Sequence, residues 1–62
     1  MKSIRVEYVI YKQTSLNMYP MEVYAEEFYD EALLRLDEIR KRYPQCTYVL
    51  AKRVITEEIL EV

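Results

Sequence analysis

One segment of the sequence has a clear helical periodicity and therefore constrains what the rest of the chain can form. Its residues 28–43 read FYDEALLRLDEIRKRY. Apolar side chains recur there every three or four positions, as on one face of a helix with about 3.6 residues per turn. They are Phe28, Ala32, Leu33, Leu36, Ile39 and Tyr43. We expect a helix here, and an apolar surface elsewhere in the chain on which this helix lies.

The charges around this segment support the same prediction. Acidic residues stand at its start and basic residues at its end, an order that complements the helix dipole. Acid–base pairs four residues apart would each stabilise an exposed helix face by about 0.2–0.5 kcal/mol. These pairs are Glu31–Arg35, Asp37–Lys41 and Glu38–Arg42. Pro44 disfavours helical geometry at Tyr43 and so ends the helix.

The sequence predicts a single small α+β domain, residues 1–62. A chain of this length buries only about 60% of its unfolded surface, so its stability is expected to be marginal. The lone cysteine, Cys46, excludes an intrachain disulfide, and without histidine the usual zinc sites are excluded as well. We expect no metal and no cofactor. Self-association or a partner protein is then the remaining source of support.

The sequence contains no glycine, and this excludes several functional motifs. Phosphate-binding loops, dinucleotide fingerprints and nucleophile elbows need close backbone approach or positive φ, which glycine supplies. Tight Asn-Gly hairpin turns are excluded too, so connections should be longer and irregular.

Three segments are predicted to be β-strands. Residues 3–12 and 21–25 alternate between two kinds of side chain, and residues 46–55 are rich in β-branched and aromatic residues. Alternate positions from Ile4 to Ile10 form an apolar face that can receive the helix. In the third strand the pattern leaves open which set of side chains faces inward.

These elements predict a β-β-α-β fold. The first two strands pair antiparallel through a long loop, and a right-handed crossover through the helix places the third strand beside the first. The result is a three-stranded antiparallel sheet of order 2-1-3 with one helix packed on one face.

Two apolar segments have no fixed place in this scheme. Residues 13–20 interrupt the alternation, and Asn17 is the best candidate there for a left-handed turn. The apolar residues of this loop either fold back onto the core or contact another molecule; they are Leu16, Met18 and Tyr19. Residues 56–62, TEEILEV, could prolong the third strand, pair separately or fray, and their apolar side chains indicate that something covers them.

The carboxylates are numerous but do not predict an enzyme. A catalytic pair needs a concave, partly dry pocket that separates two pKa values, and one helix on a single sheet offers little concavity. Cys46 has no histidine base to activate it, and its ordinary interpretation is a small apolar residue at a strand start. We expect no catalytic residue.

Nucleic acid and membranes are weaker candidates than protein. Arg35, Lys41, Arg42, Lys52 and Arg53 could form a basic patch, and tyrosines on an open sheet could stack bases. However, the net charge is −2, and phosphate neutralisation dominates such affinities. The sequence has no apolar run long enough to span a bilayer, and we expect a cytoplasmic protein.

Protein contact fits the sequence best. The outer sheet face is expected to carry Arg5, Glu7, Val9, Tyr11, Glu22 and Tyr24. Tyrosine and arginine are over-represented at interface hot spots, although a single tyrosine more often just caps a half-exposed sheet. The terminal segment could add a strand to another sheet, or pair with itself in a symmetric dimer. The candidate contact residues are Val9, Tyr11, Tyr24, Ile59, Leu60 and Val62.

Parts of the sequence resemble known small proteins. The helix ending RKRYP and the closing stretch YVLAKRVITEEILE, within residues 31–61, resemble short uncharacterised proteins encoded by phages and prophages of Gram-positive bacteria. The element order and the VYAE stretch before the helix are also similar to the small epsilon subunit of bacterial RNA polymerase. These resemblances imply a small accessory or host-interacting protein, of phage origin by the first. The second selects the alternative function, a small nucleic-acid-binding or RNA-polymerase-associated accessory protein.

Overall fold

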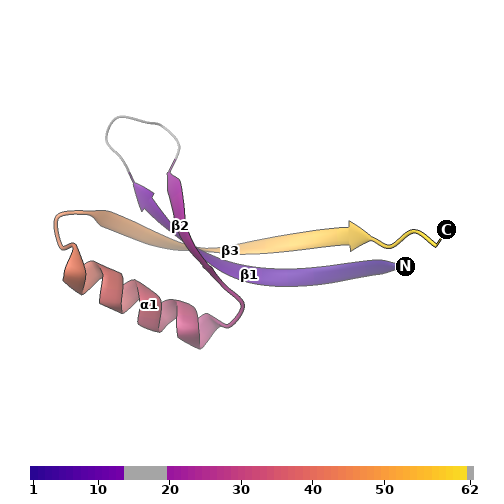
Figure 1. The fold of residues 1–62 in the computed structure, drawn as a ribbon, viewed down its shortest axis with the longest axis horizontal. Coiled ribbons are helices and arrows are strands. Elements are labelled where there is room, and N and C mark those ends of the chain that lie inside the picture. The colour runs from indigo at the N-terminus through magenta and orange to yellow at the C-terminus, as the bar shows by residue number, and fades with distance from the viewer. Residues whose placement is uncertain (14–19, 62) are drawn as a thin grey trace.

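The computed structural model describes residues 1–13 and 20–61, and these form the predicted β-β-α-β order (Figure 1). The elements are β1 (Lys2–Gln13), β2 (Met21–Glu26), α1 (Tyr29–Arg42) and β3 (Thr47–Glu58). The strands form an antiparallel sheet in the order β2-β1-β3, and α1 contacts that sheet. The predicted fold class, α+β with sheet order 2-1-3, is confirmed.

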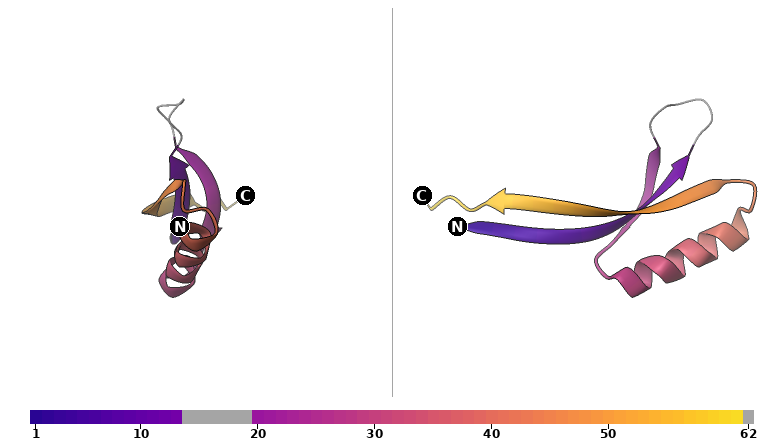
Figure 2. Two further views of the ribbon diagram at one scale, coloured as in Figure 1. Left: turned by 90° about the vertical axis from the view of Figure 1, so that its left-hand side faces the viewer. Right: turned by 180° about the vertical axis from the view of Figure 1, so that it is seen from behind.

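β1 and β3 pair along their whole length, whereas β2 pairs with only part of β1. The β1–β3 register runs without a break from Lys2 opposite Glu58 to Gln13 opposite Thr47. β2 lies opposite only Tyr8–Lys12. As Figures 1 and 2 show, the first half of β1 and the second half of β3 therefore continue together beyond β2 and α1. The longest dimension of the chain is 50 Å.

The core lies between α1 and the part of the sheet where the three strands run together. Ile10 of β1, Leu36 of α1 and Tyr48 of β3 are buried at its centre. Partly buried side chains that pack against them are Val23, Ile39, Cys46 and Leu50. Burial of a side chain the size of Ile10 contributes about 1.5–3 kcal/mol before conformational entropy is subtracted.

This core distinguishes the two faces of the sheet. Even-numbered residues of β1 and β3, such as Ile10 and Leu50, lie on the face that α1 covers, which we call the helix-side face. Odd-numbered residues, such as Val9 and Ala51, lie on the opposite face, which we call the open face. The facing of the third strand, which the sequence leaves open, is thereby fixed.

α1 is one residue shorter at each end than the predicted helix. Phe28 is extended, with φ −110° and ψ 136°, and directly precedes it. The side chains that α1 turns toward the sheet are Ala32, Leu36 and Ile39. The other members of the predicted apolar stripe are exposed: Phe28, Leu33 and Tyr43. Among the described residues, this helix is neither long nor apolar enough to cross a membrane.

Charged side chains of α1 only partly follow the predicted helical pairs. Asp37 and Lys41 form an ion pair at 2.9 Å. Arg35 turns instead toward β2, where its Nε lies 3.3 Å from Glu26 and its guanidinium carbon lies 4.7 Å from the centre of the Tyr24 ring. This side chain therefore joins the helix to the sheet instead of stabilising the helix surface.

A β-bulge changes the facing of β2. Ile10 lies opposite Tyr24, but the next residue, Tyr11, lies opposite Glu22, so Val23 is an extra residue on β2. Glu22 consequently lies on the open face, while Tyr24 lies on the helix-side face, against Arg35 of α1. The prediction that Tyr24 shares the outer face with Glu22 is therefore wrong.

β3 is longer than the predicted strand and includes the first three residues of the terminal segment, 56–58. It extends to Glu58, and the Ile59 N–H then donates to the Met1 carbonyl at 2.7 Å. Three alternatives were predicted for residues 56–62, and the structure confirms prolongation of the third strand as far as Glu58. The predictions for Asn17 and its apolar neighbours in the loop, and for Val62, lie outside the described residues.

Candidate protein-contact surface

β1 and β3 form a two-stranded ribbon that extends beyond the core. We call it the arm: Lys2–Glu7 of β1 with Arg53–Glu58 of β3. The lengths of the elements account for it. The 14 residues of α1 span about 21 Å at about 1.5 Å each, whereas the 12 residues of β1 span about 40 Å at about 3.3 Å each. One helix can therefore cover only about half of the β1–β3 ribbon.

The helix-side face of the arm exposes apolar side chains. Ile4 is 71% exposed and Val54 is 57% exposed, and half-buried Val6 lies opposite Val54. At the tip, Ile59 is half exposed and Leu60 is 74% exposed. Neither α1 nor β2 extends over these positions (Figures 1 and 2). An exposed apolar surface of this kind is typical of a contact site.

The outer edge of β3 presents backbone hydrogen-bonding groups. Met1 and Ile59 exchange backbone bonds, at 2.7 and 3.4 Å, so they form a hydrogen-bonded pair. Because such pairs alternate in an antiparallel ladder, the backbone groups of odd-numbered β3 residues point to β1 and those of even-numbered residues point outward. Arg40 Nη2 donates to the outward Tyr48 carbonyl at 3.0 Å. From Leu50 onward, the outward groups have no strand partner in the described part of the chain.

On the open face, an arginine bridge crosses the sheet. Arg53 of β3 donates from Nη2 to Glu7 of β1 at 2.6 Å and from Nη1 to Glu22 of β2 at 3.1 Å. Since β1 lies between the other two strands, this single guanidinium connects all three. Val9 of β1, on the same face, is fully buried.

The bridge also shifts the pKa values of Glu7 and Arg53. Hydrogen bonds from Arg53 lower the pKa of Glu7 below its ordinary value, although partial burial opposes this. The bonds to Glu22 and Glu7 raise the pKa of Arg53 above its ordinary value. Glu7 and Arg53 therefore remain charged at neutral pH, and their ion pair stabilises the sheet.

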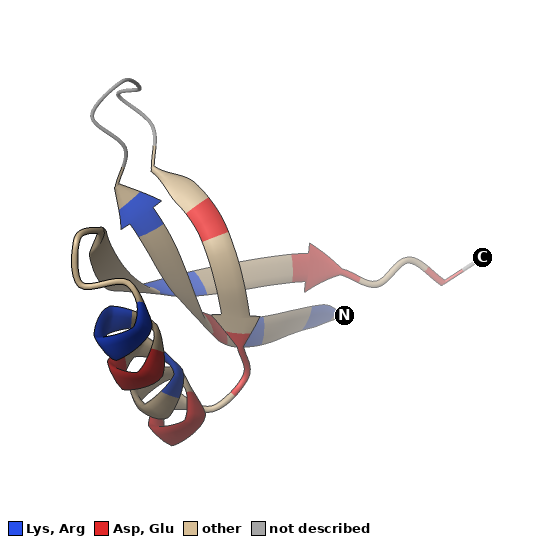
Figure 3. Cartoon of the chain, turned by 60° about the vertical axis from the view of Figure 1, so that its left-hand side comes forward, with Lys and Arg blue, Asp and Glu red and all other residues tan. Residues whose placement is uncertain are grey.

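Most of the basic residues considered for nucleic-acid binding already have partners. Figure 3 shows acidic and basic positions interspersed along α1 and the strands. Arg35, Lys41 and Arg53 are in ion pairs, and Arg42 lies beside the Tyr43 ring. The predicted basic patch is thus largely neutralised by neighbouring groups.

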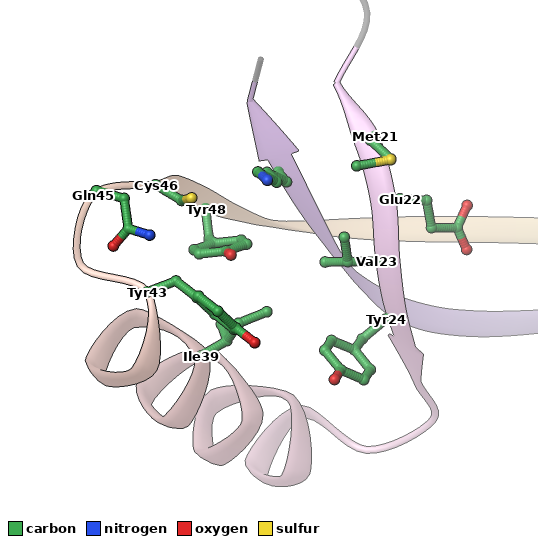
Figure 4. A pocket seen from close by; sticks show the side chains of 10 residues that line it. Met21, Glu22, Val23, Tyr24, Ile39, Tyr43, Gln45, Cys46 and Tyr48 are labelled. Atoms are coloured by element: carbon green, nitrogen blue, oxygen red, sulfur yellow. The ribbon is translucent and has the colours of Figure 1, made fainter.

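A shallow, open hollow of about 680 Å³ lies between β2, the end of α1 and the start of β3 (Figure 4). Val23, Tyr24, Ile39, Tyr43 and Tyr48 point toward it. Burial raises the pKa of Tyr48, and the neighbouring Cys46 thiol adds to the rise. The Tyr48 hydroxyl therefore remains protonated at neutral pH, and the hollow is lined mainly by aromatic rings and aliphatic side chains.

The carboxylates of the described residues do not gather into a metal site. No group of three or more His, Cys, Asp or Glu side chains in residues 1–13 and 20–61 is placed to hold a metal ion. The two that approach each other on the open face, Glu7 and Glu22, do so through their shared arginine.

The predicted contact residues are not brought together on one surface. Val9 is fully buried on the open face and is not accessible to a partner in this structure. Tyr11 is half-buried on that same face, whereas Tyr24 lies on the other face, at the hollow. Ile59 and Leu60 lie at the tip of the arm, and Val62 lies outside the described residues.

The sequence did not predict Ile4 and Val54 as candidate contact residues. Ile4 belongs to the apolar alternation of β1, so it was expected under the helix. A comparison of lengths would have found it, because a helix of this size cannot reach both ends of a long strand.

Comparison with protein-family models, with curated proteins and with solved structures gives no match.

Proposed function

We propose that this protein is a non-enzymatic protein–protein interaction module that acts through its arm, as a homodimer or by binding a host protein. The proposal places it in the cytoplasm and, from the resemblance of residues 31–61, in a phage or prophage. The observation that carries it is the exposed apolar face around Ile4 and Val54, on strands that extend beyond the core.

Two further observations support protein over nucleic acid as the partner. The basic side chains of α1 and β3 are largely engaged with carboxylates or with protein carbonyls. The arm itself carries both signs of charge, with Arg5 near Glu7 and Glu57 at 3.6 and 4.0 Å. A mixed surface of this kind has little long-range attraction for phosphate.

The test is to place a charge on the apolar face of the arm. Ile4→Asp and Val54→Asp should reduce self-association, measured by light scattering, or capture of a protein partner, measured by pull-down with the purified chain. Leu34→Asp is the matched control, because Leu34 is 66% exposed on α1, away from the arm. Circular dichroism establishes that each variant is folded.

The proposal is lost if folded Ile4→Asp and Val54→Asp variants bind as the unchanged chain does. Salt-dependent binding of DNA or RNA by the unchanged chain, with no protein contact, would favour the accessory-protein alternative instead.

A further inference from the structure

We propose that the partner at the outer edge of β3 is a second copy of this chain, paired antiparallel about a twofold axis at Ile55. This inference rests on the proposed function, because it accepts the arm as a protein-contact surface, and it adds the partner and the register. The two sheets would join into one, in the order β2-β1-β3-β3′-β1′-β2′.

The edge is open over a stretch centred on Ile55. Arg40 occupies the outward carbonyl of Tyr48, so the free edge begins at Leu50, and pairing with β1 continues to Ile59. This stretch has no proline or glycine, and its register with β1 has no bulge. Proline residues and bulges are among the features with which proteins protect a long edge strand, because its unpaired backbone groups recruit another strand.

The charge pattern selects one register of self-pairing. With Ile55 on the axis, Lys52 lies opposite the partner's Glu58, and Arg53 lies opposite the partner's Glu57. Symmetry produces each pair twice, and opposing residues share a face of the sheet. Lys52 and Glu58 are both exposed and make no ion pair among the described residues, so this pair is free to form. Arg53 is already bonded to Glu7 and Glu22, so its pair contributes less.

Apolar residues match in the same register. Leu50 lies opposite the partner's Leu60, and Ala51 lies opposite the partner's Ile59. Moving the axis to Val54 sets Leu50 opposite the partner's Glu58. Moving the axis to Thr56 sets Val54 opposite the partner's Glu58. Both shifts lose the ion pairs and oppose a carboxylate to an apolar side chain.

The backbone permits this register. The outward-pointing residues of β3 are even-numbered, and an axis at Ile55 sets Val54 opposite the partner's Thr56, both even-numbered. The helices leave room for the pairing, since α1 packs near Leu50, about 17 Å along the strand from the axis. Both copies of α1 would lie on the same face of the joined sheet, at either end of the apolar arms.

The other open edge of the arm fits a second copy less well. Self-pairing along Lys2–Glu7 with an axis at Arg5 would oppose two arginines. An axis at Ile4 would set Lys2 opposite the partner's Val6. An axis at Val6 would set Arg5 opposite the partner's Glu7, but β2 occupies the edge from Tyr8 onward and leaves only a short stretch to pair. The edge of β3 is therefore the better complement to itself.

The first experiment reverses charges and measures the mass of the whole chain by light scattering over a range of concentrations. The unchanged chain should approach twice 7.6 kDa. Lys52→Glu and Glu58→Lys should each weaken dimer formation by roughly tenfold or more, since each creates two like-charge pairs across the interface. The double variant, Lys52→Glu with Glu58→Lys, should restore dimer formation. Leu34→Lys, on the far side of α1, is the control that should change nothing.

The second experiment tests the register directly. Ile55→Cys in a Cys46→Ala background should form an intermolecular disulfide on mild oxidation. The two cysteines would occupy a pair without hydrogen bonds, where Cα atoms lie about 4.5 Å apart, within the range of a disulfide. Thr47→Cys in the same background is the control, because its two copies would lie roughly 50 Å apart.

The outcomes separate this inference from the proposed function. A monomer at every concentration, or a dimer in which Ile55→Cys forms no disulfide and the charge double variant restores nothing, overturns the β3 pairing. In that case the proposed function still stands if Ile4→Asp abolishes capture of another protein. If Ile4→Asp and Val54→Asp also change nothing, both are lost.

Discussion

Arg53 Nη1 lies 3.1 Å from Glu22 Oε2, although the two residues belong to strands that do not pair with each other. The guanidinium therefore spans β1 on the open face. At the level it crosses, Val9 has only alanines as cross-strand neighbours, Ala25 on β2 and Ala51 on β3. These small neighbours leave room for the long side chain of Arg53. That side chain accounts for the full burial of Val9 on a face that no described helix covers.

Replacement of Arg53 by methionine should therefore destabilise the sheet more than an ordinary surface change. The variant loses the bonds to both strands and leaves Glu7 and Glu22 near each other without their counterion. We expect the midpoint of thermal unfolding to fall by several degrees, whereas Arg5→Met, which removes only long contacts at 3.6 and 4.0 Å, should have a much smaller effect. Equal midpoints for the two variants would show that the bridge is not important for stability.

The same bridge predicts loss of stability in acid. Because the pKa of folded Glu7 is lowered, its contribution is fully present above the ordinary value of 4.5 and is lost as the pH falls through the lower folded value. Thermal unfolding measured from about pH 7 to about pH 3 should show Glu7→Gln as less stable at neutral pH, and the difference from the unchanged chain should shrink as the pH falls below 4.5. Glu27→Gln is the control, since Glu27 makes no ion pair within the described residues. A constant difference between Glu7→Gln and the unchanged chain across this range would contradict the account.

The small core predicts a sharp contrast between two leucines of α1. Leu36 is buried against Ile10 and Tyr48, and Leu36→Ala should cost about 2–5 kcal/mol. At roughly 0.05–0.15 kcal/mol per residue, the whole chain has only about 3–9 kcal/mol to lose. The variant should be largely unfolded in urea concentrations that leave the unchanged chain folded. Leu34→Ala, at an exposed position, should stay within about 0.5 kcal/mol. Similar losses for both would mean that α1 packs by a different face.

The sequence predicted the element order and sheet topology because periodicity and charge order are local signals. The helix shows a repeat of three and four residues before Pro44, and the strand at Ile4–Ile10 shows a repeat of two. With one helix between the second and third strands, few arrangements remain. The apolar stripe was predicted too broadly, since Phe28, Leu33 and Tyr43 are exposed.

The candidate site was harder to predict, because it depends on register. The bulge that moves Tyr24 to the helix side carries no glycine or other mark in the sequence. The burial of Val9 requires Arg53 and Glu22, which are far apart in the chain, to be placed across the same strand. The length of β3 depends on pairing with β1, which stabilises two glutamates, Glu57 and Glu58, that have weak strand propensity of their own.

Proline substitution can test which amides of β3 face outward, independently of charge. The N–H of Val54 points away from β1, so Val54→Pro removes no bond of the described ladder, and proline is tolerated at such edge positions. We expect this variant to remain folded and to be monomeric. Ile55→Pro, one residue further on, removes an N–H that pairs with β1 and should disrupt the arm. Circular dichroism and light scattering distinguish the two. If Val54→Pro still dimerises as the unchanged chain does, the contact between copies does not use this edge. If Ile55→Pro is as stable as Val54→Pro, the alternation inferred from the Met1–Ile59 pair is wrong.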